Sequence, residues 1–171
     1  AHRGARGLGG VAICLLAPWC ALEGRSLRLP DSSLDPVFLD NVRTATALMG
    51  SWWGHDPIHF IPPAAGTDHI VPAREAPGTT ALFFSGGIDS FYSMIRNPDI
   101  DVLVFIVGFD VRLHNRDTWE AMLRTYRELA AERGLRFIAI ATNLRDHPIL
   151  GRMRWARYHG VVLTAAGHLL R

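Results

Sequence analysis

Lysine is absent from this 171-residue sequence, so all 18 of its basic residues are arginines. A catalytic ammonium group, a Schiff-base lysine and a lysine clamp on phosphate are therefore excluded within these residues. A cation that binds phosphate here has to be an arginine, a protonated histidine or a metal ion. The formal net charge is only +2 and no block of like charges occurs, so the sequence gives no evidence for a nucleic-acid partner.

Cysteine is scarce, and long apolar runs are missing. Cys14 and Cys20 have the spacing of neither a zinc motif nor a CxxC redox pair, and both lie in an apolar stretch, so we expect buried, reduced thiols. That stretch is shorter than the roughly 20 residues that span a bilayer. Arg3 and Arg6 precede it, as in a signal peptide, but we favour a buried helix in an N-terminal region.

The N-terminal region, residues 1–78, predicts a helix followed by irregular structure. The helix is expected over residues 35–50, with Asp35 as its N-cap and Gly50 as its stop. Residues 57–76 are rich in proline and glycine around short apolar runs, which is typical of edge strands or connectors. We expect this region to be truncated, and the sequence leaves open whether it forms a domain of its own.

Four residues of this region could ligate a metal ion. His55, Asp56 and His59 lie close together, and His69 follows. Pro57 prevents them from sharing one regular helical face, so a metal site is the weaker interpretation of this cluster.

From residue 79 onward, strand and helix patterns alternate. The run 102–107 is apolar without alternation, as in a strand covered on both faces. Such a pattern predicts an α/β fold with a parallel sheet, flanking helices and right-handed crossovers. We expect this domain to cover residues 79–171 and to be incomplete at its C-terminus. Strands are expected at 79–84, 102–107 and 136–141, and helices at 89–95, from 117 to Gly134, and at about 155–170.

The segment Ser85-Gly86-Gly87-Ile88-Asp89-Ser90 joins the first of these strands to its helix. Adjacent glycines let the backbone come close to an anion, and the N-terminus of the helix favours negative charge. Ser85 and Ser90 add hydroxyl donors, and Asp89 could cap the turn or hold a magnesium ion. The alternative is a glycine turn without a ligand. No GxxxxGK[ST] sequence is present, so cleavage between the β and γ phosphates is not supported.

An SGGxDS segment after a strand resembles the PP-loop of the N-type ATP pyrophosphatases, a group that includes NAD synthetase, GMP synthetase, asparagine synthetase and 7-cyano-7-deazaguanine synthase. The resemblance is strongest over residues 79–96 and does not reach residues 1–78. It implies an adenine nucleotide α-hydrolase-like, Rossmann-like fold. It also implies an ATP site in which Ser85, Gly86, Gly87, Asp89 and Ser90 hold the pyrophosphate part, with Mg²⁺ at Asp89.

The same resemblance implies that backbone groups of Ile106 and Val107 read the adenine. Family members place AMP on an oxygen of the acceptor and release pyrophosphate, and a nitrogen or sulfur nucleophile then displaces the AMP. We expect such a ligase or synthetase to act on a small molecule in the cytoplasm, without membrane contact, and a homodimer is left open. On this view Gly86→Val should abolish ATP binding without unfolding the chain.

Polar residues follow the second and third strands of the predicted sheet. Asp110, Asn143, Arg145 and His147 are candidate contacts to substrate or phosphate, and Arg145 could stabilise charge at the α-phosphate as a catalytic group. The alternative is that they cap helices and turns. Two other functions also stay open. One is a nucleotide-binding sensor or decayed module without catalysis, and the other is a tRNA-modifying thiolase.

Overall fold

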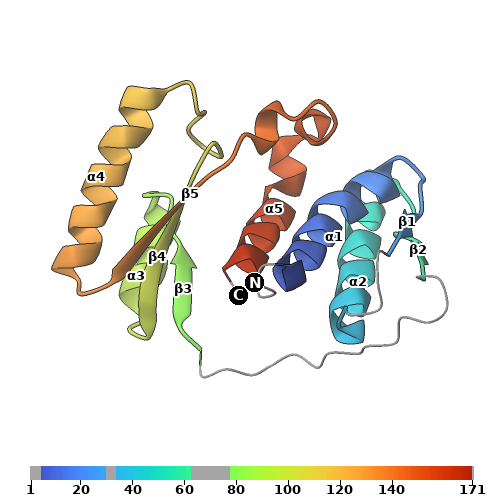
Figure 1. Ribbon diagram of the computed structural model, residues 1–171, viewed down its shortest axis with the longest axis horizontal. Coiled ribbons are helices and arrows are strands. Elements are labelled where there is room, and N and C mark those ends of the chain that lie inside the picture. The colour runs from blue at the N-terminus through green and yellow to red at the C-terminus, as the bar shows by residue number, and fades with distance from the viewer. Residues whose placement is uncertain (1–4, 30–33, 63–77, 171) are drawn as a thin grey trace. The chain divides into compact units, whose positions relative to one another are not determined.

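The computed structural model describes residues 5–29, 34–62 and 78–170 of the chain (Figure 1). Its elements are helices and small parallel sheets, so the chain belongs to the mixed α/β class. The chain divides into two compact units, which we name the helical unit (Ala1–Arg74 with Met153–Arg171) and the α/β unit (Glu75–Arg152). Within the described ranges, no helix combines the length and the apolar character needed to cross a membrane.

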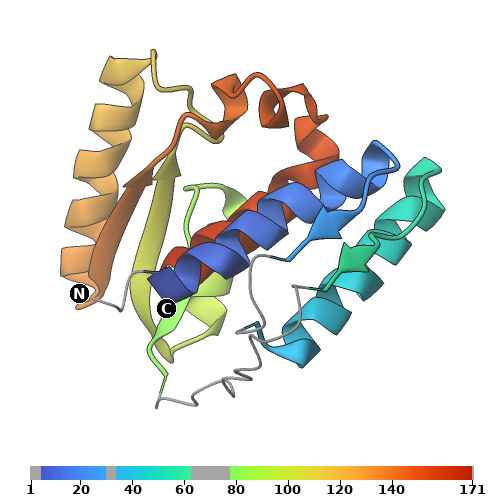
Figure 2. The same ribbon diagram turned by 45° about the vertical axis from the view of Figure 1, so that its right-hand side comes forward.

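The helical unit contains three long helices, α1 (Ala5–Leu22), α2 (Pro36–Trp53) and α5 (Trp155–Leu169). Helix α1 packs against both α5 and α2, as Figures 1 and 2 show. Small side chains, among them Ala17 and Ala165, are buried on these helices and allow close packing. By these contacts α5 belongs with α1, whereas the sequence pattern grouped it with the strands of residues 79–141. Cys14 and Cys20 are buried and not joined in a disulfide, so the prediction of buried thiols is confirmed.

Helix α2 begins where the sequence predicts and ends later than expected. A carboxylate oxygen of Asp35 accepts a hydrogen bond from the backbone N–H of Val37 at 2.8 Å, which satisfies one open donor of the first turn. The expected stop at Gly50 is wrong, because the helix continues to a left-handed C-cap at Gly54. Gly50 is instead a buried helical position where any side chain would overlap the carbonyl of His55.

A two-stranded parallel sheet, β1 (Leu27–Arg28) with β2 (Phe60–Ile61), completes the helical unit. Within the apolar run at residues 58–61, which was expected to be an edge strand or a connector, Phe60 and Ile61 form a strand. His69 and the second apolar run lie outside the described residues. One ring nitrogen of His59 lies 3.1 Å from the hydroxyl of Ser26. In the part of the chain that the structure describes, no three His, Cys, Asp or Glu side chains gather as metal ligands.

The α/β unit is built on a three-stranded parallel sheet in the order β3-β4-β5. The strands are β3 (Thr80–Phe83), β4 (Ile100–Val107) and β5 (Arg136–Ala141), close to the predicted ranges. All residues of β4 except Asp101 are buried, which confirms that its unbroken apolar run marks a central strand. The parallel sheet that the alternating pattern predicts is therefore present.

Helices α3 (Ile88–Arg96) and α4 (Arg116–Glu132) connect these strands. Met94 from α3 and Tyr126 from α4 share one hydrophobic cluster with Phe84 and with Leu103 of β4. Because the two helices join the same cluster, they cover the same face of the sheet, as consecutive right-handed crossovers require. The apolar spacing within residues 117–134 predicts one buried face of α4, and this face is confirmed. Its residues all belong to the cluster: Trp119, Met122, Leu123, Tyr126, Leu129 and Ala130.

The spacing of Asp117 and Glu120 in the sequence predicts a capping box at the start of α4, but this box does not form. The helix begins one residue before Asp117, and its N-cap, Asn115, makes no side-chain capping bond. The Glu120 carboxylate accepts a hydrogen bond from the Arg116 guanidinium at 2.7 Å instead of turning back to the helix start. An (i, i+4) ion pair competes here with the capping geometry.

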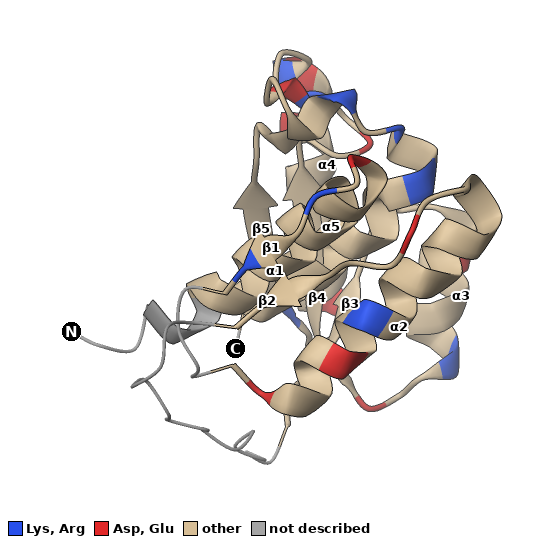
Figure 3. Cartoon of the chain, turned by 90° about the vertical axis from the view of Figure 1, so that its right-hand side faces the viewer, with Lys and Arg blue, Asp and Glu red and all other residues tan. Residues whose placement is uncertain are grey.

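Positions of acidic and basic residues are interspersed along the elements, as the colours in Figure 3 show. That distribution agrees with the small net charge of +2. Both units therefore carry charges of both signs, and any preference for charged ligands has to come from local groups.

Candidate anion-binding loop and sheet edge

The loop after β3 places backbone donors at the N-terminus of a helix. The N–H of Phe84 still donates to the carbonyl of Val104 at 2.8 Å, so the strand extends to the loop itself. Gly87 is the N-cap of α3, and its carbonyl accepts from the N–H groups of Ser90 and Phe91, both at 3.1 Å. The amides before Ser90 have no acceptor within the helix, and together with the helix dipole they favour an anion at this point.

The two glycines of the loop have different physical reasons to be glycine. Gly86 has φ +79°, and a Cβ there would overlap the hydroxyl of Tyr126, so the fold itself requires this residue. Gly87 has φ −78° and ψ 166°, a conformation open to any residue. A Cβ on Gly87 would come no closer than 3.5 Å, to the hydroxyl of Ser85, so packing does not require a glycine here. The space above Gly87 is where a ligand could approach the backbone.

Some side chains of the loop form hydrogen bonds within the protein, and others are exposed to solvent. The Ser90 hydroxyl is buried and donates to the carbonyl of Gly87 at 2.8 Å, so its proton holds the helix start together. The Ser85 hydroxyl accepts a long hydrogen bond, 3.4 Å, from the N–H of Gly87 and keeps its own proton for another partner. Asp89 lies exposed in the first turn of α3. Of the predicted ligands, Ser85, Gly87 and Asp89 present groups outward, and Ser90 supports them.

Tyr126 of α4 supports the loop, a role that sequence reasoning missed. Its phenol is buried among aromatic rings of the core and donates to the carbonyl of Ser85 at 2.9 Å. Burial, and to a lesser extent the charge of Asp110, raise the pKa of Tyr126, so the phenol stays protonated and remains a donor. A tyrosine among leucines on the buried face of a helix is a signal that could have indicated this role, because a buried phenol needs a partner.

Strand β4 extends past β3 along the loop. The ladder between the two strands ends with Phe83 opposite Val104, yet β4 continues to Val107. Successive residues of a strand direct their backbone groups to alternate sides, so Ile106 faces the same side as Val104, towards the loop. On the other side, the carbonyl of Val107 accepts from Thr142 at 3.0 Å. Of the two residues predicted to read a base, Ile106 therefore has the orientation for it, and Val107 serves the sheet.

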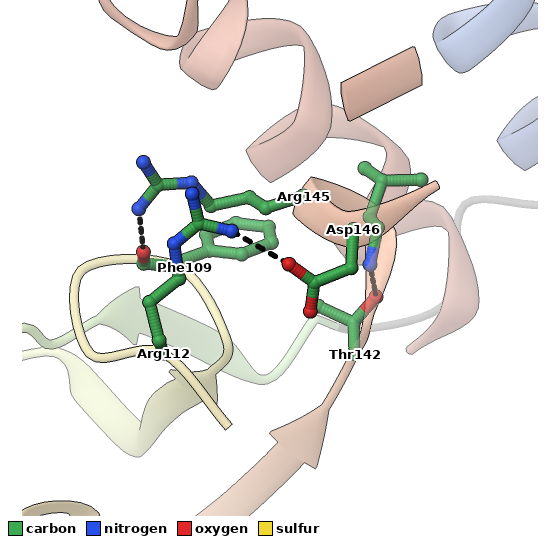
Figure 4. A network of polar contacts seen from close by, with 6 residues as sticks. Phe109, Arg112, Thr142, Arg145 and Asp146 are labelled. Atoms are coloured by element: carbon green, nitrogen blue, oxygen red, sulfur yellow. Dashed lines mark hydrogen bonds and ion pairs between the residues drawn. The ribbon is translucent and has the colours of Figure 1, made fainter. Parts of the chain in front are cut away.

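Polar bonds connect the segments that follow β4 and β5, as Figure 4 shows. The Arg145 guanidinium donates to the carbonyl of Phe109, and Arg112 pairs with Asp146 at 2.7 Å. The hydroxyl of Thr142 accepts from a backbone amide two residues on. Arg145 is thus placed at the carboxyl edge of the sheet, as predicted, and at least one of its donors maintains the contact between the two segments.

The remaining predicted contacts lie at the same edge. Asp110 is exposed, and its charge acts on the Tyr126 phenol beneath the loop. His147 uses its Nδ1 atom to accept from the amides of Ile149 and Leu150, at 3.3 and 3.2 Å, so it caps a turn. The side chain of Asn143 caps no helix. The structure therefore gives His147 a local structural task and leaves Asp110 available to a ligand.

Comparisons of the chain with models of protein families, with curated proteins and with solved structures find no match. The functional argument therefore rests on the geometry of this edge. It combines backbone donors at a helix N-terminus, an exposed hydroxyl and carboxylate, and an arginine from a neighbouring segment. Such groups can bind a phosphate chain and stabilise charge on it.

Proposed function

We propose that the chain binds ATP at the loop Ser85–Ser90 and acts as a synthetase or ligase that forms AMP and pyrophosphate. The observation that carries the proposal is Gly87. The fold allows a side chain at this position, yet the residue is a glycine with open space above it at the start of a helix. A phosphate oxygen that approaches the backbone would explain why this residue is a glycine.

The edge of the sheet suggests how the rest of the nucleotide lies. With the phosphates at the N-terminus of α3, the adenine extends along β4, where the backbone groups of Ile106 lie beyond the last ladder pair. The exposed carboxylate of Asp89 suits Mg²⁺, which usually takes one or two carboxylates together with phosphate oxygens. When bound, Mg²⁺ would neutralise charge on the pyrophosphate. This arrangement is the PP-loop type that the sequence resembles.

The reaction follows from what these residues can stabilise. An oxygen of a small-molecule acceptor attacks the α-phosphorus, the bond to the bridging oxygen breaks, and pyrophosphate leaves with its charge held by the loop amides and the Ser85 hydroxyl. Arg145 brings a cation to the same edge of the sheet, from the segment after β5. A guanidinium has five N–H donors and can donate to more than one acceptor, so Arg145 could contact the phosphate as well as the carbonyl of Phe109.

Product analysis with MgATP and a pool of small metabolites tests the proposal. We expect AMP and pyrophosphate in equal amounts, and loss of both in Ser85→Ala and Asp89→Asn. Tyr92→Phe, an exposed change on the same helix, is the control and should retain turnover. Formation of ADP and phosphate, or turnover that survives both loop changes, would contradict the assignment.

A nucleotide-binding module without catalysis is the second candidate. Two observations favour it: the sequence contains no lysine, and Arg145 already donates to the carbonyl of Phe109. Saturable binding of MgATP without AMP formation in any metabolite pool would support this function. A thiolase gains no support, because Cys14 and Cys20 are buried in the helical unit and burial raises the pKa of the Cys14 thiol to about 11.

A further inference from the structure

A cavity of about 320 Å³ that is open to solvent lies between α1, α2 and α5 of the helical unit. Its apolar wall includes Phe38 and Met49 of α2 and Val161 of α5. None of the described residues that line it is an aspartate, glutamate or arginine. An anion would lose part of its hydration here without an arginine to pair with, and a cation without a carboxylate, so the cavity favours a neutral ligand.

The size of the cavity limits the ligand. An engineered apolar cavity of about 150 Å³ binds benzene, so about twice that volume has room for two fused rings. The thioether of Met49 and the ring of Phe38 provide favourable contacts for an aromatic ligand. Natural ligand sites are of this kind, mainly apolar with a few placed polar groups.

The polar groups of the cavity wall differ in whether they can still accept a hydrogen bond from a ligand. Thr46 donates to backbone carbonyls of its own helix and accepts from the N–H of Ile58, so its hydroxyl is used within the fold. Thr164 donates to the carbonyl of Gly160 at 3.0 Å and retains lone pairs as an acceptor. Asn41 brings an amide to the same cavity. A ligand that carries an O–H or N–H group therefore finds an acceptor in Thr164 or Asn41.

Helix α1 contributes a further acceptor. Pro18 and Cys14 both line the cavity and are four residues apart. Proline has no N–H, so the carbonyl of Cys14 lacks the amide donor that an α-helix would supply at this place. A proline inside a helix costs stability, and here it leaves the carbonyl of a residue that lines the cavity without its usual helical donor.

The ring of His168 is fixed at another wall by its neighbours. Its ring meets Phe38 edge to face, with centroids 4.8 Å apart. A Cβ on Gly10 would come within 2.9 Å of the Nδ1 atom of His168, so the lack of a side chain at Gly10 leaves room for the ring. The wall is therefore preformed, which lowers the entropic cost of binding.

We propose that this cavity binds a neutral bicyclic aromatic molecule with one hydroxyl or N–H donor. The inference is independent of the nucleotide function, because all lining residues belong to the helical unit. Fused rings fill the volume between Phe38, Met49 and Val161, and the donor of the ligand binds the Thr164 hydroxyl. An anionic relative of the same size is disfavoured because none of the described lining residues is an arginine.

Calorimetric titration of the full chain with 2-naphthol, and with 2-naphthoate as the charged relative, tests this proposal. We expect one saturable site for 2-naphthol and at least about tenfold weaker binding of the naphthoate. Thr164→Val keeps the shape but removes the acceptor, and should weaken 2-naphthol about tenfold. Absence of 2-naphthol binding, or equal binding of the two compounds, would overturn the proposal.

The position of the site is tested with a matched pair of variants on α2. Ala45 lines the cavity and is otherwise exposed, so Ala45→Leu should fill the cavity and abolish binding while the chain still folds. Ala47 is exposed on the same helix and is not part of the lining, so Ala47→Leu should bind as the wild type does. Binding that survives in Ala45→Leu, with the fold checked by thermal unfolding, would place the ligand elsewhere and refute the assignment.

Discussion

The glycine loop of the α/β unit and the cavity of the helical unit differ in the polar groups they present. The loop offers backbone N–H donors at the start of α3 and suits an anion. The cavity offers acceptors, among them the Thr164 hydroxyl, and its described lining contains no aspartate, glutamate or arginine. The two proposed sites would therefore select opposite classes of ligand by the direction of their hydrogen bonds and by the charge around them.

The same comparison can be made within the loop, between neighbouring glycines. Gly86 is required by a left-handed backbone and by the Tyr126 hydroxyl, whereas nothing in the packing requires Gly87. A glycine that the fold explains is weak evidence for a ligand, and a glycine that it leaves unexplained is stronger evidence. The expectation that Gly86→Val would spare the fold therefore has to be revised.

Adding one methyl group at Gly86 should have the largest effect on stability. Gly86→Ala forces a side chain into a φ of +79° and against Tyr126, and we expect a loss of about 3 kcal/mol in the free energy of unfolding. Gly87→Ala is the matched control and should cost about 1 kcal/mol or less. Chemical denaturation followed by circular dichroism measures both. Equal losses would show that the two glycines do the same structural work.

Adding the same methyl group at Gly87 should mainly affect binding. The Cβ occupies the space in which a phosphate oxygen would approach the backbone, so the affinity for MgATP should fall about tenfold or more. Calorimetric titration of the folded variant measures the change. Unchanged affinity would mean that the nucleotide, if bound at all, does not approach this glycine.

The loop could be found from the sequence because its signal is local. Ser85–Ser90 are contiguous, and strand and helix patterns flank them, so turn and helix start were predicted to within one residue. Tyr126 was placed on the buried face of its helix, but its bond to Ser85 joins residues 41 positions apart. No local sequence pattern indicates a hydrogen bond between residues so far apart in the chain.

The cavity and the grouping of α5 with α1 could not be predicted from the sequence, because both depend on contacts between residues far apart in the chain. The lining extends from Cys14 to His168, over three helices that meet only in the folded unit. Each helix alone shows ordinary apolar periodicity, and a cavity is the volume that remains after the side chains have packed. The wrongly predicted helix end at Gly50 has a similar origin. Gly50 is a glycine because a side chain there would overlap the carbonyl of His55, and not because the helix ends at this residue.

The cavity side of the comparison predicts a dependence of stability on pH. Burial raises the pKa of the Cys14 thiol from 9.0 to about 11, so the native chain keeps a proton that the unfolded chain releases first. This contribution to stability is therefore present below pH 9 and is lost as the pH rises towards 11, by about 1 kcal/mol at pH 10. The difference between the wild type and Cys14→Ala isolates this contribution from the other groups that titrate there. A difference that stays constant from pH 8 to 10.5 would contradict the assignment.

The loop side predicts a smaller effect that links the core to the ligand site. Tyr126→Phe removes the donor to the Ser85 carbonyl while leaving the ring in its cluster, and should cost about 1 kcal/mol of unfolding free energy. Tyr92→Phe removes an exposed hydroxyl from α3 and should cost almost nothing. If the bond also orients the loop, Tyr126→Phe should weaken MgATP binding at a temperature where the chain is fully folded, while Tyr92→Phe should not. Loss of stability without loss of affinity would restrict Tyr126 to the fold and leave the geometry of the loop to the glycines alone.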